Sequence, residues 1–140
     1  MPNQVTVFLE NEKGRLASMC RTLADATVNL SALTIADTAS YGVARLLVDK
    51  PQIAVAALTN AGYRVRLVDV AAVEIPNVPG SLAVLLEAFD KAGFNLEYAY
   101  CFGSGVEKVV VAFKAEKIDG IEEIVGRLGY RLLQSEDLLS

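Results

Sequence analysis

The stretch that decides the fold is Asn11–Leu30, NEKGRLASMCRTLADATVNL, because it returns further along the chain as Asn77–Leu96, NVPGSLAVLLEAFDKAGFNL. At a constant offset of 66 positions the two stretches share seven identical residues, where unrelated segments of average composition share about one. The triplet Gly-Tyr-Arg at 62–64 also returns at 129–131. The chain of 140 residues is therefore predicted to be a tandem duplication, with domains at residues 1–69 and 70–140.

Hydrophobic periodicity predicts the same succession of elements in each copy. Apolar residues alternate over 5–9 and 73–75, as they do in half-buried strands. They then recur at i, i+3, i+4 and i+7 over 16–23 and 82–89, which predicts the buried face of a helix. A hairpin, a second helix and a last strand follow in each copy. The order βαββαβ with right-handed crossovers predicts the α+β class: two ferredoxin-like domains, each an antiparallel sheet with both helices on one face.

Composition excludes several kinds of site and partner. The chain has no histidine and only two cysteines, which excludes a Ser-His-Asp triad and a zinc site built from thiolates or imidazoles. The net charge of −4 disfavours nucleic acid, which needs a basic face. No apolar run approaches the ~18 residues of a membrane span, and the start of the sequence has no basic region typical of a signal peptide. We expect a cytoplasmic protein with no membrane partner, no cofactor and no metal.

The loop before the first helix of the second copy, residues 77–82, has the features of an anion cradle. Pro79 restricts φ, and Gly80 has no Cβ, so another molecule can approach the backbone closely. The amides of residues 80–82 lie in a first helical turn, where they have no partners within the helix. A carboxylate bound there would satisfy them and meet the positive end of the helix dipole.

The pattern Asn-x-Pro-Gly-x-Leu in this loop, followed by Asn95 after the helix, resembles the ACT domain. This small regulatory module binds amino acids in enzymes such as phosphoglycerate dehydrogenase and the regulatory subunit of acetolactate synthase. The resemblance covers the whole chain as two repeats, and the first is looser because Lys13 stands at the proline position. It implies a non-catalytic sensor that binds a free amino acid at interfaces between domains, where the second strand of a neighbouring domain completes the pocket. The implied ligand-binding residues are Asn77, Val78, Pro79, Gly80, Ser81, Leu82 and Asn95 in the second copy and Asn11, Gly14, Arg15, Leu16 and Asn29 in the first.

The same residues also suit purely structural roles. Gly80 after Pro79 is typical of a simple turn into a helix, and Asn95 is typical of a helix-to-strand turn. The alternative functions are a ligand-free oligomerisation module and a regulatory component of an amino-acid biosynthetic enzyme such as acetolactate synthase. We expect at least a homodimer, because uncovered sheet faces and edges are costly to leave in water, and an enzyme is a further expected partner.

An enzymatic function would need a base or a nucleophile held in a pocket. Without histidine, the side chains that remain as candidates are Asp37, Glu97, Glu107, Lys108, Cys20 and Cys101. They form no recognisable constellation along the sequence, so we expect no catalytic residues.

Overall fold

The computed structural model describes residues 1–10, 12–37, 41–103, 105–116 and 119–138. The first half contains β1 (Asn3–Glu10), α1 (Arg15–Asp25), β2 (Leu30–Asp37), β3 (Tyr41–Val48), α2 (Pro51–Asn60) and β4 (Arg64–Asp69). The second half contains β5 (Ala71–Pro76), α3 (Ser81–Lys91), β6 (Leu96–Gly103), β7 (Lys108–Ala115), α4 (Ile121–Arg127), β8 (Arg131–Leu133) and a short 3₁₀ helix, Ser135–Leu138.

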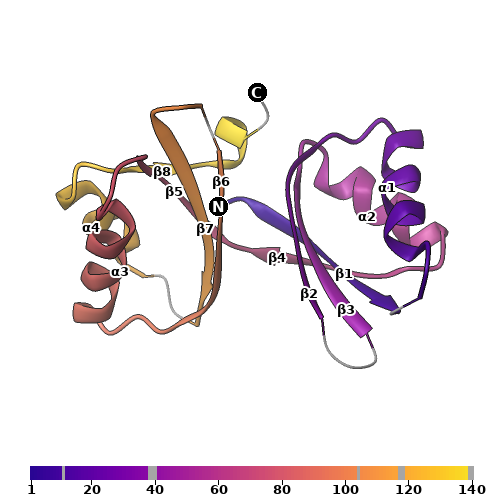
Figure 1. Ribbon diagram of the computed structural model, residues 1–140, viewed down its shortest axis with the longest axis horizontal. Helices are drawn as coiled ribbons and strands as arrows, with labels where there is room; N and C mark the ends of the chain where they lie inside the picture. Colours follow the sequence, from indigo (N-terminus) through magenta and orange to yellow (C-terminus); the bar gives the residue numbers. More distant parts are fainter. Residues whose placement is uncertain (11, 38–40, 104, 117–118, 139–140) are drawn as a thin grey trace. The chain divides into compact units, whose positions relative to one another are not determined.

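Each half forms its own four-stranded antiparallel sheet with the same strand order. The first sheet runs β2-β3-β1-β4, and the second runs β6-β7-β5-β8. Figure 1 shows α1 and α2 together on one face of the first sheet, and α3 and α4 together on one face of the second. The predicted fold class, two ferredoxin-like α+β domains, is confirmed.

The chain divides into two compact units. The N-terminal unit is Asn3–Asp69 with Leu138, and the C-terminal unit is Val70–Asp137 with Met1–Pro2. The first residues are held in the C-terminal unit by hydrogen bonds: Val70 N–H donates to Pro2 O at 3.0 Å, and Ser135 Oγ donates to Met1 O at 3.2 Å. No helix in the described ranges is long and apolar enough to cross a membrane.

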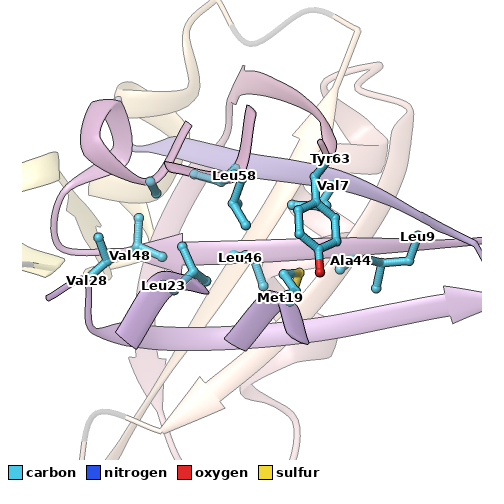
Figure 2. Close-up of a cluster of buried hydrophobic side chains, with 12 residues drawn as sticks. Val7, Leu9, Met19, Leu23, Val28, Ala44, Leu46, Val48, Leu58 and Tyr63 are labelled. Atoms are coloured by element: carbon cyan, nitrogen blue, oxygen red, sulfur yellow. The ribbon is translucent and has the colours of Figure 1, made fainter. Parts of the chain in front are cut away.

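Each unit packs its own core between the helices and the sheet. In the N-terminal unit the core side chains include Val7, Met19, Leu23, Leu46, Leu58 and Tyr63, and Figure 2 shows Tyr63 among them.

The buried helix faces predicted from the sequence are correct in the middle of each helix, but the first residue predicted for each face is not buried. Met19 and Leu85 are fully buried, whereas Leu16 and Leu82 are each 38% exposed. Both leucines lie in the first turn of their helix, next to the loop that enters it.

The two units end their first helices with the same turn but with different residues. Gly93 follows α3 with φ +84°, and Thr27 follows α1 at the equivalent position with φ +58°. Glycine adopts this left-handed conformation freely, whereas a β-branched side chain is strained there. The strain at Thr27 is therefore local to one copy of the duplicated turn.

Replacing Thr27 with the residue of its counterpart should stabilise the N-terminal unit. We expect Thr27→Gly to raise the free energy of unfolding by about 0.5–1 kcal/mol, because relief of the left-handed strain exceeds the extra chain entropy of glycine. Urea denaturation followed by circular dichroism measures the change. The reverse exchange, Gly93→Thr, is the matched control and should destabilise the protein; a gain in stability from both exchanges would contradict the role of strain.

Candidate functional site

The loop between β5 and α3 presents its backbone to open space. Gly80 is the residue from which α3 starts, and its φ of +91° is in the left-handed region that glycine adopts without strain. A Cβ built on Gly80 would meet no atom within 4 Å. Val78, two residues earlier, is 60% exposed. The loop is therefore accessible to a second molecule on the side of the glycine.

Asn77 holds this loop against the connection between β6 and β7. Its backbone N–H donates to Glu107 O at 2.8 Å, and its side-chain Nδ2 donates to Val106 O at 3.0 Å. One role of Asn77 is thus structural, and the amide orientation that it fixes leaves Oδ1 as an acceptor. The side chain is positioned by these contacts before any ligand arrives.

The first-turn amides differ in how much hydrogen bonding they retain for a ligand. Ser81 N–H donates to Val78 O at 3.3 Å, a long hydrogen bond that closes the turn. Within the described ranges the amides of Gly80 and Leu82 have no backbone acceptor. Of the three predicted carboxylate donors, two are therefore free and the third is already weakly engaged.

A tyrosine that sequence reasoning passed over supports this turn in both units. Tyr130 Oη donates to Ser81 O at 3.3 Å, and Tyr63 Oη donates to Arg15 O at 3.4 Å, so each hydroxyl holds the carbonyl of the first residue of a helix. The signal was present in the sequence, since both tyrosines belong to the duplicated Gly-Tyr-Arg triplet. Through its tyrosine, the triplet connects the turn before β4 to the start of α1, and the turn before β8 to the start of α3.

Asn95 lies at the other end of α3 from Asn77. Asn77 precedes the helix and Asn95 follows it, and a helix of 11 residues is roughly 16 Å long. Asn95 is exposed, next to the start of β6. One C-terminal unit therefore does not bring the two asparagines together around one small ligand.

The first copy repeats this separation. Asn29 follows α1, where its backbone N–H donates to Asp49 Oδ1 at 2.9 Å and its side chain is exposed. Gly14 starts α1 with φ +88°, as Gly80 starts α3. Asn11, predicted as the counterpart of Asn77, lies outside the described residues.

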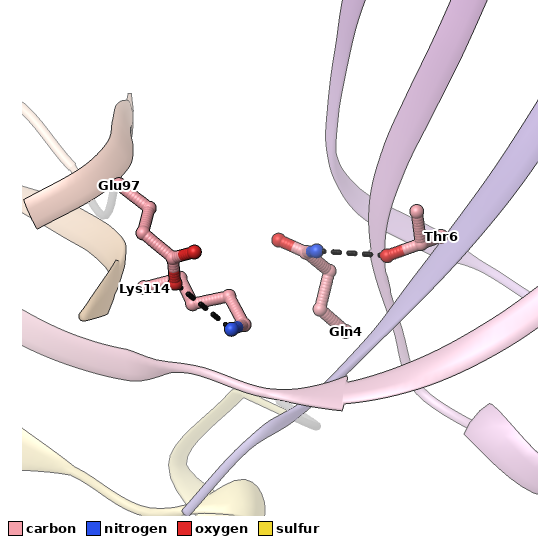
Figure 3. A network of polar contacts seen from close by, with 4 residues as sticks. All are labelled: Gln4, Thr6, Glu97 and Lys114. Atoms are coloured by element: carbon pink, nitrogen blue, oxygen red, sulfur yellow. Dashed lines mark hydrogen bonds and ion pairs between the residues drawn. The ribbon is translucent and has the colours of Figure 1, made fainter. Parts of the chain in front are cut away.

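Among the candidates for catalysis whose side chains the structure describes, one carboxylate is held in an ion pair. Glu97 is held by Lys114, whose Nζ lies 2.9 Å from Glu97 Oε2, and this hydrogen bond raises the pKa of Lys114 (Figure 3). Figure 3 also shows a second polar pair, in the N-terminal unit, where Gln4 Nε2 donates to Thr6 Oγ1 at 3.0 Å. The side chain of Asp37 lies outside the described part of the chain.

The two cysteines are placed differently. Cys20 packs against the core of the N-terminal unit, and Cys101 is exposed on β6. Partial burial of the Cys101 sulfur raises the pKa of its thiol, which lowers the fraction of thiolate near neutral pH. In the described residues no three His, Cys, Asp or Glu side chains are grouped so that they could hold a metal ion.

Comparison with known proteins shows the family of the chain. The family described as the ACT domain pair matches residues 2–140. The chain belongs to this family. ACT domain pairs are regulatory modules, and no catalytic family is indicated for the chain. A search of curated proteins found no match.

Several solved structures are similar to this chain over most of its length. Protein BT0572 from Bacteroides thetaiotaomicron is 34% identical, with a TM-score of 0.92 over 99% of this chain and 96% of that one. The regulatory subunit of aspartate kinase from Thermus thermophilus, in a ligand-free form, is 20% identical, with a TM-score of 0.68 over 89% and 90% of the two chains. The equivalent subunit from Thermus flavus, also 20% identical, has a TM-score of 0.65 over the same shares. At this identity the two kinase subunits share the fold with this ACT domain pair.

The raised pKa of Cys101 has a direct chemical consequence. Raising the pKa shifts ionisation to higher pH, so alkylation of Cys101 by iodoacetamide should rise with an apparent pKa above that of a cysteine peptide measured alongside. Mass spectrometry on the Cys20→Ala variant measures the rate against pH. An apparent pKa below that of the peptide would contradict the burial effect and would make Cys101 a candidate nucleophile.

Proposed function

We propose that this ACT domain pair, with domains at residues 1–69 and 70–140, is a non-catalytic sensor of a free amino acid in the cytoplasm. The observation that carries the proposal is the turn at Gly80, which combines a left-handed glycine, open space and two first-turn amides without backbone acceptors. The ligand's carboxylate accepts from the amides of Gly80 and Leu82 at the positive end of α3. Asn77 Oδ1 accepts from its ammonium group.

The expected affinity is modest and suits a metabolite pool. An amino acid of about eight to ten heavy atoms gains up to ~1.5 kcal/mol per atom in the best small-ligand sites. Millimolar to micromolar binding needs only about 4–8 kcal/mol, so a few good hydrogen bonds are sufficient. The second copy should bind more tightly than the first, because Lys13 replaces the loop proline there and leaves φ less restricted.

A homodimer resolves the distance between Asn77 and Asn95. If the sheets of two copies meet edge to edge in antiparallel fashion through β6, the loop before α3 of one copy faces the end of α3 in the other. Asn95 then completes a pocket that Asn77 begins. The sheet order supports this role, since β6 lies at the edge of its sheet, where its backbone can pair with another strand.

The regulated partner, in this proposal, is an enzyme of amino-acid biosynthesis. The fold shared with regulatory subunits of aspartate kinase supports a chain that acts on an enzyme rather than as one. Alternatively, the chain is a regulatory component of acetolactate synthase. A ligand-free oligomerisation module is the alternative function, and the hydrogen bonds of Asn77 within the loop favour it, because they give that residue a structural role without a ligand.

Filling the open space at Gly80 should abolish binding. Valine is unsuitable, because the positive φ at Gly80 would strain a β-branched side chain, whereas asparagine tolerates the left-handed region. We expect calorimetry to detect one of the twenty amino acids with the wild type and none with Gly80→Asn. Gly120→Asn is the matched control, since Gly120 starts α4 with φ +84° and also faces open space.

Equal affinity in Gly80→Asn and Gly120→Asn would place the ligand elsewhere. Heat with none of the twenty amino acids, in a protein that is a dimer by light scattering, would favour the oligomerisation module. A wild-type protein that is monomeric at micromolar concentration would contradict the shared pocket.

Asn95→Ala should weaken amino-acid binding by about 1–3 kcal/mol, the usual cost of leaving a buried polar partner unpaired.

The decisive measurement uses a mixed dimer, in which one copy carries Asn95→Ala and the other carries Gly80→Asn. If each pocket takes Gly80 from one copy and Asn95 from the other, one pocket of the mixed dimer has both changes and the other has neither. The intact pocket then binds with wild-type affinity, at half the wild-type number of sites. A mixed dimer without any wild-type site would show that both residues act within one copy.

A further inference from the structure

The N-terminal unit has a cavity of about 530 Å³ at the start of α1. This volume is in the range typical of sites for small molecules. Its lining includes two arginines, Arg15 and Arg64, two aromatic residues, Phe8 and Tyr63, and one carboxylate, Glu10. In a chain with a net charge of −4, the ionisable groups of this lining are mainly cationic.

Arg15 is held in position by an aromatic ring. Its guanidinium carbon lies 4.6 Å from the centroid of Tyr63, and the hydroxyl of Tyr63 donates to Arg15 O at 3.4 Å. Arg15 Nε is buried and has no hydrogen-bond acceptor. The guanidinium therefore lies over an aromatic ring, and its buried Nε has no acceptor among the described residues.

Arg64, the first residue of β4, also lies over an aromatic ring, that of Phe8 on β1. It lies directly opposite Phe8 in the β1–β4 register, and its guanidinium carbon is 5.6 Å from the Phe8 ring centroid. Within the described ranges neither Arg15 nor Arg64 forms an ion pair, and Glu10 is within ion-pair distance of neither. In the part of the chain that the structure describes, both cations thus line the cavity without a carboxylate in ion-pair contact.

In the C-terminal unit, the arginine at the equivalent position is neutralised by a carboxylate. Arg131, the counterpart of Arg64, lies opposite Glu74 in the β5–β8 register and forms an ion pair with Asp137 at 2.8 Å. At the positions equivalent to Glu74 and Ser81, the N-terminal unit has Phe8 and Arg15. Where the C-terminal unit has a carboxylate and a hydroxyl, the N-terminal unit thus has an aromatic ring and a second guanidinium.

We infer that the cavity at the start of α1 is an oxyanion site, in which Arg15 and Arg64 bind a small molecule through a carboxylate or phosphate group. A guanidinium donates two parallel hydrogen bonds to such a group, and a stacked arginine loses little freedom when it does so. Glu10 at the rim disfavours a ligand that carries negative charge over its whole surface. This site goes beyond the sensor proposed at the loop before α3, because it combines Arg15, which the resemblance implies as a ligand contact, with Arg64 and a cavity wall of Phe8 and Tyr63 that the resemblance does not imply.

The first test uses probes that lack an amino group and follows the amide signals of the cavity itself, because a carboxylate can also bind the amides at the start of α3. Succinate, inorganic phosphate and neutral succinamide are titrated into ¹⁵N-labelled protein at constant ionic strength. We expect succinate or phosphate to shift the amide signals of residues 8–10 and 62–64, and succinamide to leave them in place. Saturation by succinate identifies a carboxylate ligand, and saturation by phosphate alone identifies a phosphate ligand. If neither anion shifts these signals, the inference is wrong.

The second test assigns the effect to the two arginines. Arg15→Ser introduces the residue of the second copy, and Arg64→Gln removes the other cation while keeping a hydrogen-bonding side chain. Each should weaken anion binding roughly tenfold or more, the usual effect of losing a hydrogen bond from a charged group. Arg21→Ser removes the same charge from α1 at an exposed position and should change the affinity less than about twofold.

An equal loss of affinity in Arg15→Ser and Arg21→Ser would show a general charge effect and overturn the site. Gly80→Asn separates this inference from the sensor proposal. Anion binding that persists in Gly80→Asn supports a second, independent site, and anion binding that is lost with it would contradict the assignment to Arg15 and Arg64. Amino-acid binding in a protein that binds no anion would overturn this inference alone.

Discussion

The left-handed glycine between the first strand and the first helix of each unit is the constraint on which the rest depends. Gly14 and Gly80 have φ values of +88° and +91°, which lets the chain leave an antiparallel strand and turn at once into a helix lying across the sheet. That direction places Met19 and Leu85 in the two cores. It also leaves the first helical turn at the surface, with the backbone amides of Gly80 and Leu82 accessible. Fold and candidate site thus follow from one backbone conformation.

Duplication has preserved this turn and changed what surrounds it. Both units hold the first helical carbonyl with a tyrosine hydroxyl, from Tyr63 and Tyr130. Around that common support, the C-terminal unit pairs Arg131 with Asp137, whereas the N-terminal unit stacks the counterpart, Arg64, on the ring of Phe8. The backbone frame is shared because it is required for folding. The side chains at the rim are free to differ because few core contacts depend on them, and this freedom lets two copies of one domain present different chemistry.

The length of α3 decides what one unit can do alone. Its 11 residues separate the two ends of the helix by roughly 16 Å, further than a free amino acid can bridge. A ligand that contacts both Asn77 and Asn95 therefore requires a second copy. In the proposed homodimer, binding and association stabilise each other, since each copy contributes part of the same pocket. This coupling is the physical basis on which the proposed sensor reports a metabolite to a partner enzyme.

Sequence alone determined the duplication, the βαββαβ order and the loop at 77–82, because periodicity, glycine and proline act over a few neighbouring residues. It also contained the Gly-Tyr-Arg triplet, whose role is visible only when Tyr130 reaches Ser81. Only the tertiary structure decided that Leu16 and Leu82 stay partly exposed, that Asn95 lies far from Asn77, and that Arg15 stacks on Tyr63. These features depend on where a helix lies on its sheet and on contacts between residues distant in sequence. Local patterns specify which elements form, and packing between elements specifies which side chains meet.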